Sequence, residues 1–156
     1  MTRTPPVRLG QGFYWEDLRV GDRFCTPRRT ITEADLINFI SATGMLEEMF
    51  IDAGSRLGAA AHGRLAPAAL TYCFIEGFIL QTMIQGTGMA MLEASMKAVA
   101  PVFVGDTIEA LVEVTSVRPT SKADRAIVDS DVTVTKLGGG TVLQYSIRRM
   151  LAGRGG

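Results

Sequence analysis

Three side chains that can transfer a proton lie within one short part of this sequence. The only histidine, His62, follows a pair of adjacent carboxylates, Glu47 and Glu48. A carboxylate in an apolar pocket has its pKa raised towards neutrality, which suits a general acid or base, and an imidazole can take the same role. These residues therefore predict proton transfer. The simpler interpretation of the two glutamates is that they are solvated on a loop, with at most one of them facing inwards.

A further carboxylate, Glu76, is the one acidic residue in the apolar run of residues 65–84. An unpaired buried carboxylate is costly, so Glu76 needs a partner or an exposed edge. We expect it to pair with Arg64 or with an arginine across a dimer interface.

The element that must position these groups is a helix within residues 59–85. This stretch is apolar on every side, whereas a surface helix is apolar along one stripe only, so we expect the helix to be buried. Pro67 suits its first turn, where a missing N–H costs nothing. We expect His62 and a cluster of free backbone N–H groups at the start of this helix, with the rest of the chain wrapped around it.

The segments on either side predict one more helix and a set of strands. Thr32 is expected to cap a helix that stops at Gly44, and residues 45–63 have no sustained period, with one helical turn expected around residues 52–57. The strand candidates are residues 23–29, 89–99, 106–117, 126–135 and 141–151. Antiparallel strands that curl around a helix give an α+β fold.

Composition limits the function classes. The 156 residues suffice for one domain with a core, and a net charge of zero argues against nucleic acid and anionic membrane surfaces as partners. Pro67 and Glu76 interrupt the apolar run of residues 65–84, so no membrane span is predicted. Residues 1–12 have no apolar core of a signal peptide and are expected to form a flexible arm before a single domain at 13–152, with a flexible C-terminus at 153–156.

The cysteine and histidine content argues against a metal site. Cys25 and Cys73 are single and far apart, and there is no second histidine to complete a zinc site. We expect neither a metal nor a cofactor. Both cysteines are interpreted as small apolar residues of a cytoplasmic protein in a reducing compartment, without a disulfide.

Four segments in the same order resemble the MaoC-like hydratase/dehydratase family of hot-dog proteins. They are residues 13–24, 30–44, 61–65 and 100–114, reading FYWEDLRVGDRF, TITEADLINFISATG, AHGRL and APVFVGDTIEALVEV. The resemblance implies the hot-dog fold, a curved antiparallel β-sheet wrapped around a long central helix. It also implies hydration of trans-2-enoyl thioesters of coenzyme A or acyl carrier protein, or the reverse reaction.

The resemblance fails at the family's catalytic pair. In the family an aspartate and a histidine hold the water that adds to the double bond, while a backbone N–H near the helix start stabilises the enolate oxygen. Here Met45 stands at the aspartate position and Phe50 at the histidine position, and neither can transfer a proton. Asp52 matches a family acid that more often supports the loop than reacts.

The part of the family's site that this sequence keeps is the segment of residues 61–65, which contains His62. Gly63 carries over as the oxyanion donor because its contribution is a backbone N–H, although it could simply be a loop glycine. His62 is a candidate base or substrate contact, and we favour the interpretation that it shapes the loop, as its counterpart in the family does. Arg64 is expected to pair with Glu47 or Glu48, to bind a phosphate of coenzyme A, or to lie at the surface.

Two positions on the predicted helix complete the candidate site. The functional interpretation of Glu76 is a catalytic glutamate, as some hot-dog thioesterases use, and we favour the structural interpretation of an ion pair. Tyr72 is expected to line the core or the acyl tunnel, as are Met83, Met89 and Met91.

Three functional hypotheses follow. The first is an enoyl-thioester hydratase or dehydratase with a rearranged site. The second is a catalytically silent hot-dog subunit that binds an acyl thioester or another small apolar ligand, and the double loss at Met45 and Phe50 motivates it. The third is a thioesterase or new chemistry that relies on Glu47, Glu48 and Glu76. The expected assembly is a homodimer with its sheets side by side, or a heteromer with a catalytic MaoC-like chain.

Overall fold

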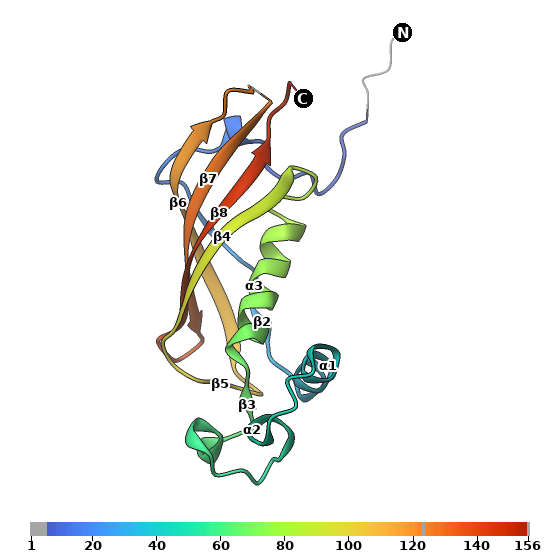
Figure 1. Ribbon diagram of the computed structural model, residues 1–156, viewed down its shortest axis with the longest axis vertical. Coiled ribbons are helices and arrows are strands. Elements are labelled where there is room, and N and C mark those ends of the chain that lie inside the picture. The colour runs from blue at the N-terminus through green and yellow to red at the C-terminus, as the bar shows by residue number, and fades with distance from the viewer. Residues whose placement is uncertain (1–5, 123, 156) are drawn as a thin grey trace.

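The computed structural model describes residues 6–122 and 124–155, and Figure 1 shows a curved sheet with one long helix along its concave side. The helices are α1 (Glu33–Thr43), α2 (Glu48–Ile51) and α3 (Ala68–Gln81), with 3-10 turns η1 (Trp15–Asp17) and η2 (Gly58–His62). The strands are β1 (Arg23–Cys25), β2 (Arg29–Thr30), β3 (Leu65–Ala66), β4 (Gly88–Ala98), β5 (Val102–Phe103), β6 (Thr107–Pro119), β7 (Arg125–Lys136) and β8 (Thr141–Ala152). The chain is therefore an α+β protein, as the sequence predicts.

The main sheet is antiparallel with strand order β1-β6-β7-β8-β4, and β2 also pairs with β6. Its register aligns residues of one face across neighbouring strands: Val112 lies opposite Val132, and Val132 lies opposite Tyr145. All three side chains are buried. The alternation of buried and exposed positions along β6, β7 and β8 matches the period of two in their sequences, so these strand predictions are confirmed.

Helix α1 also forms where its sequence predicts. Thr32 is the N-cap, its hydroxyl accepts from the Asp35 N–H at 3.2 Å, and the Asp35 carboxylate accepts from the Thr32 N–H at 2.9 Å. Partial burial favours a higher pKa for Asp35, but the hydrogen bonds from Thr32 and Arg29 outweigh it and lower the pKa below the usual range. Gly44 ends the helix with a φ of 72°, in the left-handed region that glycine adopts readily.

The segment between α1 and α3 differs from the sequence-based expectation. The helical turn expected around residues 52–57 is wrong, because Asp52 accepts a hydrogen bond from the Gly54 N–H and forms a turn instead. Strand β3 pairs with β5, so the backbone is extended just before Pro67, as is usual for residues that precede proline. Pro67 is therefore the N-cap of α3, and His62 lies on η2 rather than at the start of the long helix.

One side of α3 packs into the core, and the opposite side remains open in the single chain. Leu70, Ile75 and Ile79 are buried against the concave face of the sheet. Cys73 and Leu80 are exposed, so the expectation of a helix buried on every side is wrong. The sheet curves around one flank only, and every residue of β4, the edge strand next to the open flank, is exposed.

An ion pair attaches α3 to β8. The Tyr145 hydroxyl donates to Glu76 Oε1 at 2.7 Å, and Arg149 Nη2 donates to Glu76 Oε2 at 2.5 Å. The side chains of Arg149 and Glu76 are 7% and 13% exposed. Glu76 thus pairs with Arg149 of the same chain and not with Arg64. Burial, and then the charge of Glu76, raise the pKa of Tyr145 above its usual range, so this hydroxyl stays protonated and donates.

The first and last described segments, residues 6–12 and 153–155, lie beside the end of the sheet farthest from α1 and α2 (Figure 1). Residues 1–5 of the predicted arm and residue 156 of the predicted C-terminal tail lie outside the described residues. The arm joins the fold at Gly12, whose N–H donates to the Gln85 carbonyl at 2.8 Å; a Cβ on Gly12 would lie 2.5 Å from the Gln85 nitrogen. None of the helices in the described part of the chain has the length and apolar character needed to cross a membrane.

The ion pair yields a stability prediction. Arg149→Leu leaves the Glu76 carboxylate buried without its counter-charge, so we expect a loss of about 3–5 kcal/mol in the free energy of unfolding. The double variant Glu76→Gln/Arg149→Leu removes the charge and keeps an acceptor for Tyr145, so we expect it to recover more than half of that loss. Urea unfolding of the three proteins measures the effect.

Arg148→Leu is the matched control for this prediction. Arg148 is the neighbouring residue of the same strand, but its side chain is 42% exposed and pairs with Asp129 and Glu93 at the surface. We expect its loss to cost less than about 1 kcal/mol. Equal losses for Arg148→Leu and Arg149→Leu would contradict the role assigned to the buried pair.

Candidate functional site

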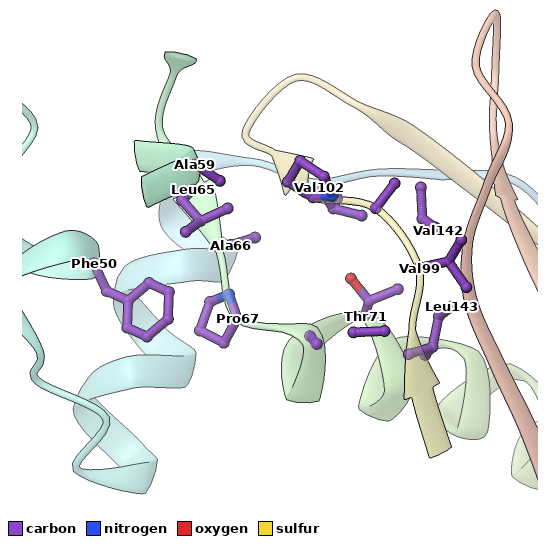
Figure 2. A pocket seen from close by; sticks show the side chains of 14 residues that line it. Phe50, Ala59, Leu65, Ala66, Pro67, Thr71, Val99, Val102, Val142 and Leu143 are labelled. Carbon is purple, nitrogen blue, oxygen red and sulfur yellow. The ribbon is translucent and has the colours of Figure 1, made fainter. Parts of the chain in front are cut away.

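A cavity of about 340 Å³ lies at the N-terminal end of α3 (Figure 2). Its walls come from β3, the first turn of α3, the connection between β4 and β5, and the start of β8, and Phe50 of α2 forms one side. Of the 14 side chains that line it, only that of Thr71 carries a polar atom. The cavity therefore suits an apolar ligand of modest size.

Thr71 lies deep in this cavity. Its side chain is 1% exposed, and its hydroxyl has no hydrogen-bond partner among the described residues. In Figure 2 the Thr71 side chain stands on α3 among the residues that line the cavity, and its hydroxyl oxygen is shielded by the surrounding atoms. Sequence-based reasoning missed Thr71, although a signal was present: it shares the i, i+4, i+8 spacing of Ile75 and Ile79 and is thus a polar residue in a buried helical stripe.

Phe50 is held at the cavity by Arg64. One Arg64 nitrogen, Nη1, donates to the Phe50 carbonyl, and Nε donates to the two oxygens of Glu33 at 3.0 and 3.2 Å. Arg64 is 16% exposed, so it does not lie at the surface, and its carboxylate partner is Glu33 rather than Glu47 or Glu48. The arginine thus joins α1, α2 and the start of β3 into one unit beside the cavity.

The carboxylates predicted to act as acid or base lie away from this cavity. Glu47 and Glu48 are exposed, and neither occupies the apolar pocket that would suit it to proton transfer. Glu47 lines a shallow hollow with Met45 and Phe50. Asp52 is exposed and holds the Gly54 N–H at 2.8 Å, which agrees with a role in supporting the loop.

His62 and Gly63 follow one another outside the 340 Å³ cavity. His62 is exposed on η2. The Gly63 N–H points to the Ala60 carbonyl at 3.4 Å, a long contact that closes the η2 turn. A Cβ on Gly63 would lie 3.1 Å from the Phe103 ring, so the glycine lets this turn approach β5 closely.

The remaining predicted residues line a second cavity of about 570 Å³ on the open flank between α3 and β4. Tyr72, Glu76 and Arg149 form its polar part. Both oxygens of Glu76 are already hydrogen-bonded. The pKa of the Cys73 thiol is raised, mainly by burial and to a smaller extent by the charge of Glu76. Both Glu76 oxygens are therefore held by donors of β8 and are not turned towards a substrate, and Cys73 stays a neutral thiol.

The structure thus separates the residues that the sequence places in one site. Phe50 belongs to the cavity at the start of α3, and Tyr72 and Glu76 belong to the cavity at its open flank. In the described part of the chain, no group of three His, Cys, Asp or Glu side chains is arranged to hold a metal ion.

Two curated proteins match the chain in sequence. Protein MaoC of Klebsiella aerogenes is 31% identical over 121 residues, which cover 72% of this chain and 33% of that protein. The (R)-specific enoyl-CoA hydratase of Rhodospirillum rubrum is 27% identical over 131 residues, which cover 78% of this chain and 90% of the hydratase. The chain therefore spans about a third of the length of the Klebsiella protein and most of the length of the hydratase. No protein-family model matches the chain.

Solved structures share the fold. The MaoC-like dehydratase from Rhodospirillum rubrum superposes with a TM-score of 0.80 at 21% identity, over 92% of this chain and 99% of that chain. The curved antiparallel sheet with a helix along its concave side is the hot-dog fold. With these sequence relatives and this fold, the chain belongs to the MaoC-like dehydratase family of hot-dog proteins.

Proposed function

We propose that the chain binds the acyl group of a thioester, of coenzyme A or of acyl carrier protein, in the cavity at the start of α3, and that it supplies no acid–base pair of its own for hydration. The observation that carries this proposal is the lining of the cavity: 13 of its 14 side chains are apolar, and Phe50 stands there in place of a proton-transfer group. Burial of an alkyl chain against such walls contributes about 0.8 kcal/mol per CH₂.

The positions of the acidic residues support a site that has no acid–base pair of its own. Glu47, Glu48 and Asp52 are exposed, and Glu76 is engaged by Arg149 and Tyr145 on another flank of α3. A general base must come within hydrogen-bond reach of the proton that it abstracts. The Gly63 N–H as oxyanion donor stays a prediction.

A second candidate function is hydration by a relocated acid–base pair. Its support is the Rhodospirillum relative, which is named an enoyl-CoA hydratase, together with the retained His62–Gly63 pair. In that case His62 or Glu47 would move towards the thioester when it binds. A thioesterase built on Glu76 has less support, because both oxygens of this carboxylate are already hydrogen-bonded.

We also propose that another hot-dog chain, a second copy or a related catalytic chain, covers the open flank of α3 and the edge of β4. The face of β4 that is continuous with the concave side of the sheet carries Met91 and Met96, which are 59% and 49% exposed. An exposed edge strand with apolar side chains favours pairing with a further strand. Leu80 on α3 is 52% exposed on the same flank.

The proposed function yields a prediction about binding and turnover. We expect calorimetry to detect hexanoyl-CoA binding to the wild type, and ultraviolet absorbance to show no hydration of trans-2-hexenoyl-CoA. Met45→Asp/Phe50→His returns the two groups that hold the water, so we expect it to gain hydration. Wild-type turnover that Glu47→Gln or His62→Ala abolishes would instead establish the second candidate function.

A variant that fills the cavity tests whether the ligand binds there. Ala68 lines the cavity on the first turn of α3, and Ala42 lies exposed on α1. We expect Ala68→Leu to weaken hexanoyl-CoA binding about tenfold or more, since overpacking costs about 1–3 kcal/mol and a factor of ten is about 1.4 kcal/mol. Ala42→Leu should leave the dissociation constant unchanged. Equal effects would place the ligand elsewhere.

Another prediction concerns Arg64, the arginine that holds Phe50. Arg64→Met keeps the aliphatic stem but removes the donors to Glu33 and to the Phe50 carbonyl. We expect a loss of about 1 kcal/mol in unfolding free energy, discounted because Glu33 is half exposed, and weaker hexanoyl-CoA binding because Phe50 loses its support. Arg56→Met, at an exposed position of the same segment, should change neither quantity. Unchanged binding in Arg64→Met would contradict the role of this arginine.

A further prediction concerns assembly. We expect light scattering after size exclusion to give a homodimer mass for the wild type and a monomer mass for Met91→Lys/Met96→Lys, because a charge on each methionine position opposes burial of the edge. Leu137→Lys changes an apolar residue that is 62% exposed in the β7–β8 turn, and it should leave the dimer intact. A wild-type monomer would contradict the homodimer and leave the related catalytic chain as the partner to be tested by co-expression.

A further inference from the structure

Arg149 is a buried arginine that keeps hydrogen-bond donors without an acceptor. Its side chain is 7% exposed, and of its nitrogen atoms only Nη2 donates to a described residue, Glu76. A guanidinium group carries N–H donors on every nitrogen, so Nε and Nη1 have no acceptor among the described residues. Neither atom is among the unpaired side-chain atoms that are shielded from solvent. Both therefore reach the open space beside them.

That space is the second cavity, of about 570 Å³, which Arg149 lines. In the register of the sheet Arg149 lies opposite Met91 of the edge strand β4, so its side chain stands at the open flank of α3. The apolar walls include Leu80 of α3, Ile84 of the following loop and Met89 of β4. A cavity of this size with largely apolar walls and a few convergent polar groups is typical of a small-molecule site.

The charges in this cavity favour a neutral ligand. Among the described residues, its charged lining consists of Arg149 and Glu76, which balance one another in the ion pair. A carboxylate ligand would bring a negative charge that nothing in this lining balances, and a buried charge without a counter-charge is costly. The carbonyl oxygen of a ketone, ester or amide accepts from the free N–H groups, in place of water, without adding a charge.

We propose that this cavity is a second ligand site, and that it binds a small apolar molecule whose neutral carbonyl oxygen accepts a hydrogen bond from Arg149. The apolar body of the ligand lies against Leu80, Ile84 and Met89. The site is separate from the cavity at the start of α3, so this inference does not rest on the binding of acyl thioesters there. The second hot-dog chain proposed to cover this flank closes the cavity over the ligand.

The test compares 2-heptanone with 2-methyl-1-heptene, in which a methylene group replaces the ketone oxygen. Titration followed by proton–nitrogen NMR gives both dissociation constants, and the amides of Gly77, Gly86 and Gly88, which line the cavity, report the place of binding. We expect Glu76→Gln/Arg149→Leu to lower the preference for the ketone about tenfold or more, about 1.4 kcal/mol, because the guanidinium donors are lost. Heptanoate should bind the wild type more weakly than 2-heptanone does.

Arg148→Leu is the matched control for the arginine. Arg148 precedes Arg149 on β8, but it pairs with Asp129 and Glu93 at the surface and does not line the cavity. Its replacement should leave the ratio of the two dissociation constants unchanged.

A second variant tests the place of binding and leaves the ion pair intact. A Cβ on Gly77 would meet no heavy atom within 4 Å, so Gly77→Leu has room for its side chain in the cavity that Gly77 lines. We expect Gly77→Leu to weaken 2-heptanone binding about tenfold or more and to leave hexanoyl-CoA binding unchanged. Ala68→Leu, which fills the cavity at the start of α3, should show the opposite pattern.

Each contrary outcome overturns the inference in a different way. An equal ratio in the wild type and in Glu76→Gln/Arg149→Leu would mean that Arg149 does not hold the ligand oxygen. Tighter binding of heptanoate than of 2-heptanone would contradict the neutral class of ligand. If no probe shifts the three glycine amides, the cavity is not a ligand site, and loss of the dimer in Glu76→Gln/Arg149→Leu would then assign the free N–H groups to the partner chain. Hexanoyl-CoA binding, measured in the same proteins, stands or falls separately.

Discussion

The packing of one side of α3 against the concave face of the sheet is the constraint on which the rest of the structure depends. Leu70, Ile75 and Ile79 bury their side chains there, and the contact removes the apolar face of β6, β7 and β8 from water. Hydrophobic contact alone does not fix the position of a helix along a sheet. The hydrogen bonds from Tyr145 and Arg149 to Glu76 supply that directional restraint, since both donors stand on the same face of β8.

The position of α3 determines where the two cavities lie. The helix begins only after Pro67, because β3 pairs with β5 and keeps the chain extended before it. This leaves the cavity at the N-terminal end of α3, closed on one side by Phe50. The sheet curves around one flank of the helix, so the other flank, with Glu76 and Leu80, faces the exposed strand β4. The two cavities therefore have different origins, one from the entry of the helix and one from the edge of the sheet.

The cavity at the start of α3 lies in a hot-dog fold, and its lining side chains are mostly apolar. Met45 and Phe50 cannot transfer protons, and Phe50 forms part of an apolar wall instead. The clamp of Arg64 on Glu33 and on the Phe50 carbonyl keeps this wall in place. A cavity that is supported in this way suits the acyl chain of the proposed ligand whether or not a proton-transfer group is present, because burial of alkyl groups needs shape and not charge.

The sequence by itself determined the features that are encoded within a few residues of one another. The cap of α1 at Thr32, its stop at Gly44 and the alternation of β6 to β8 were all predicted correctly. The tertiary structure alone decided the partners of Glu76 and Arg64, the late start of α3, its open flank and the burial of Thr71. Capping and periodicity depend on local spacing, whereas ion pairs and cavities depend on which distant segments the packing brings together, and Glu76 and Arg149 are 73 residues apart.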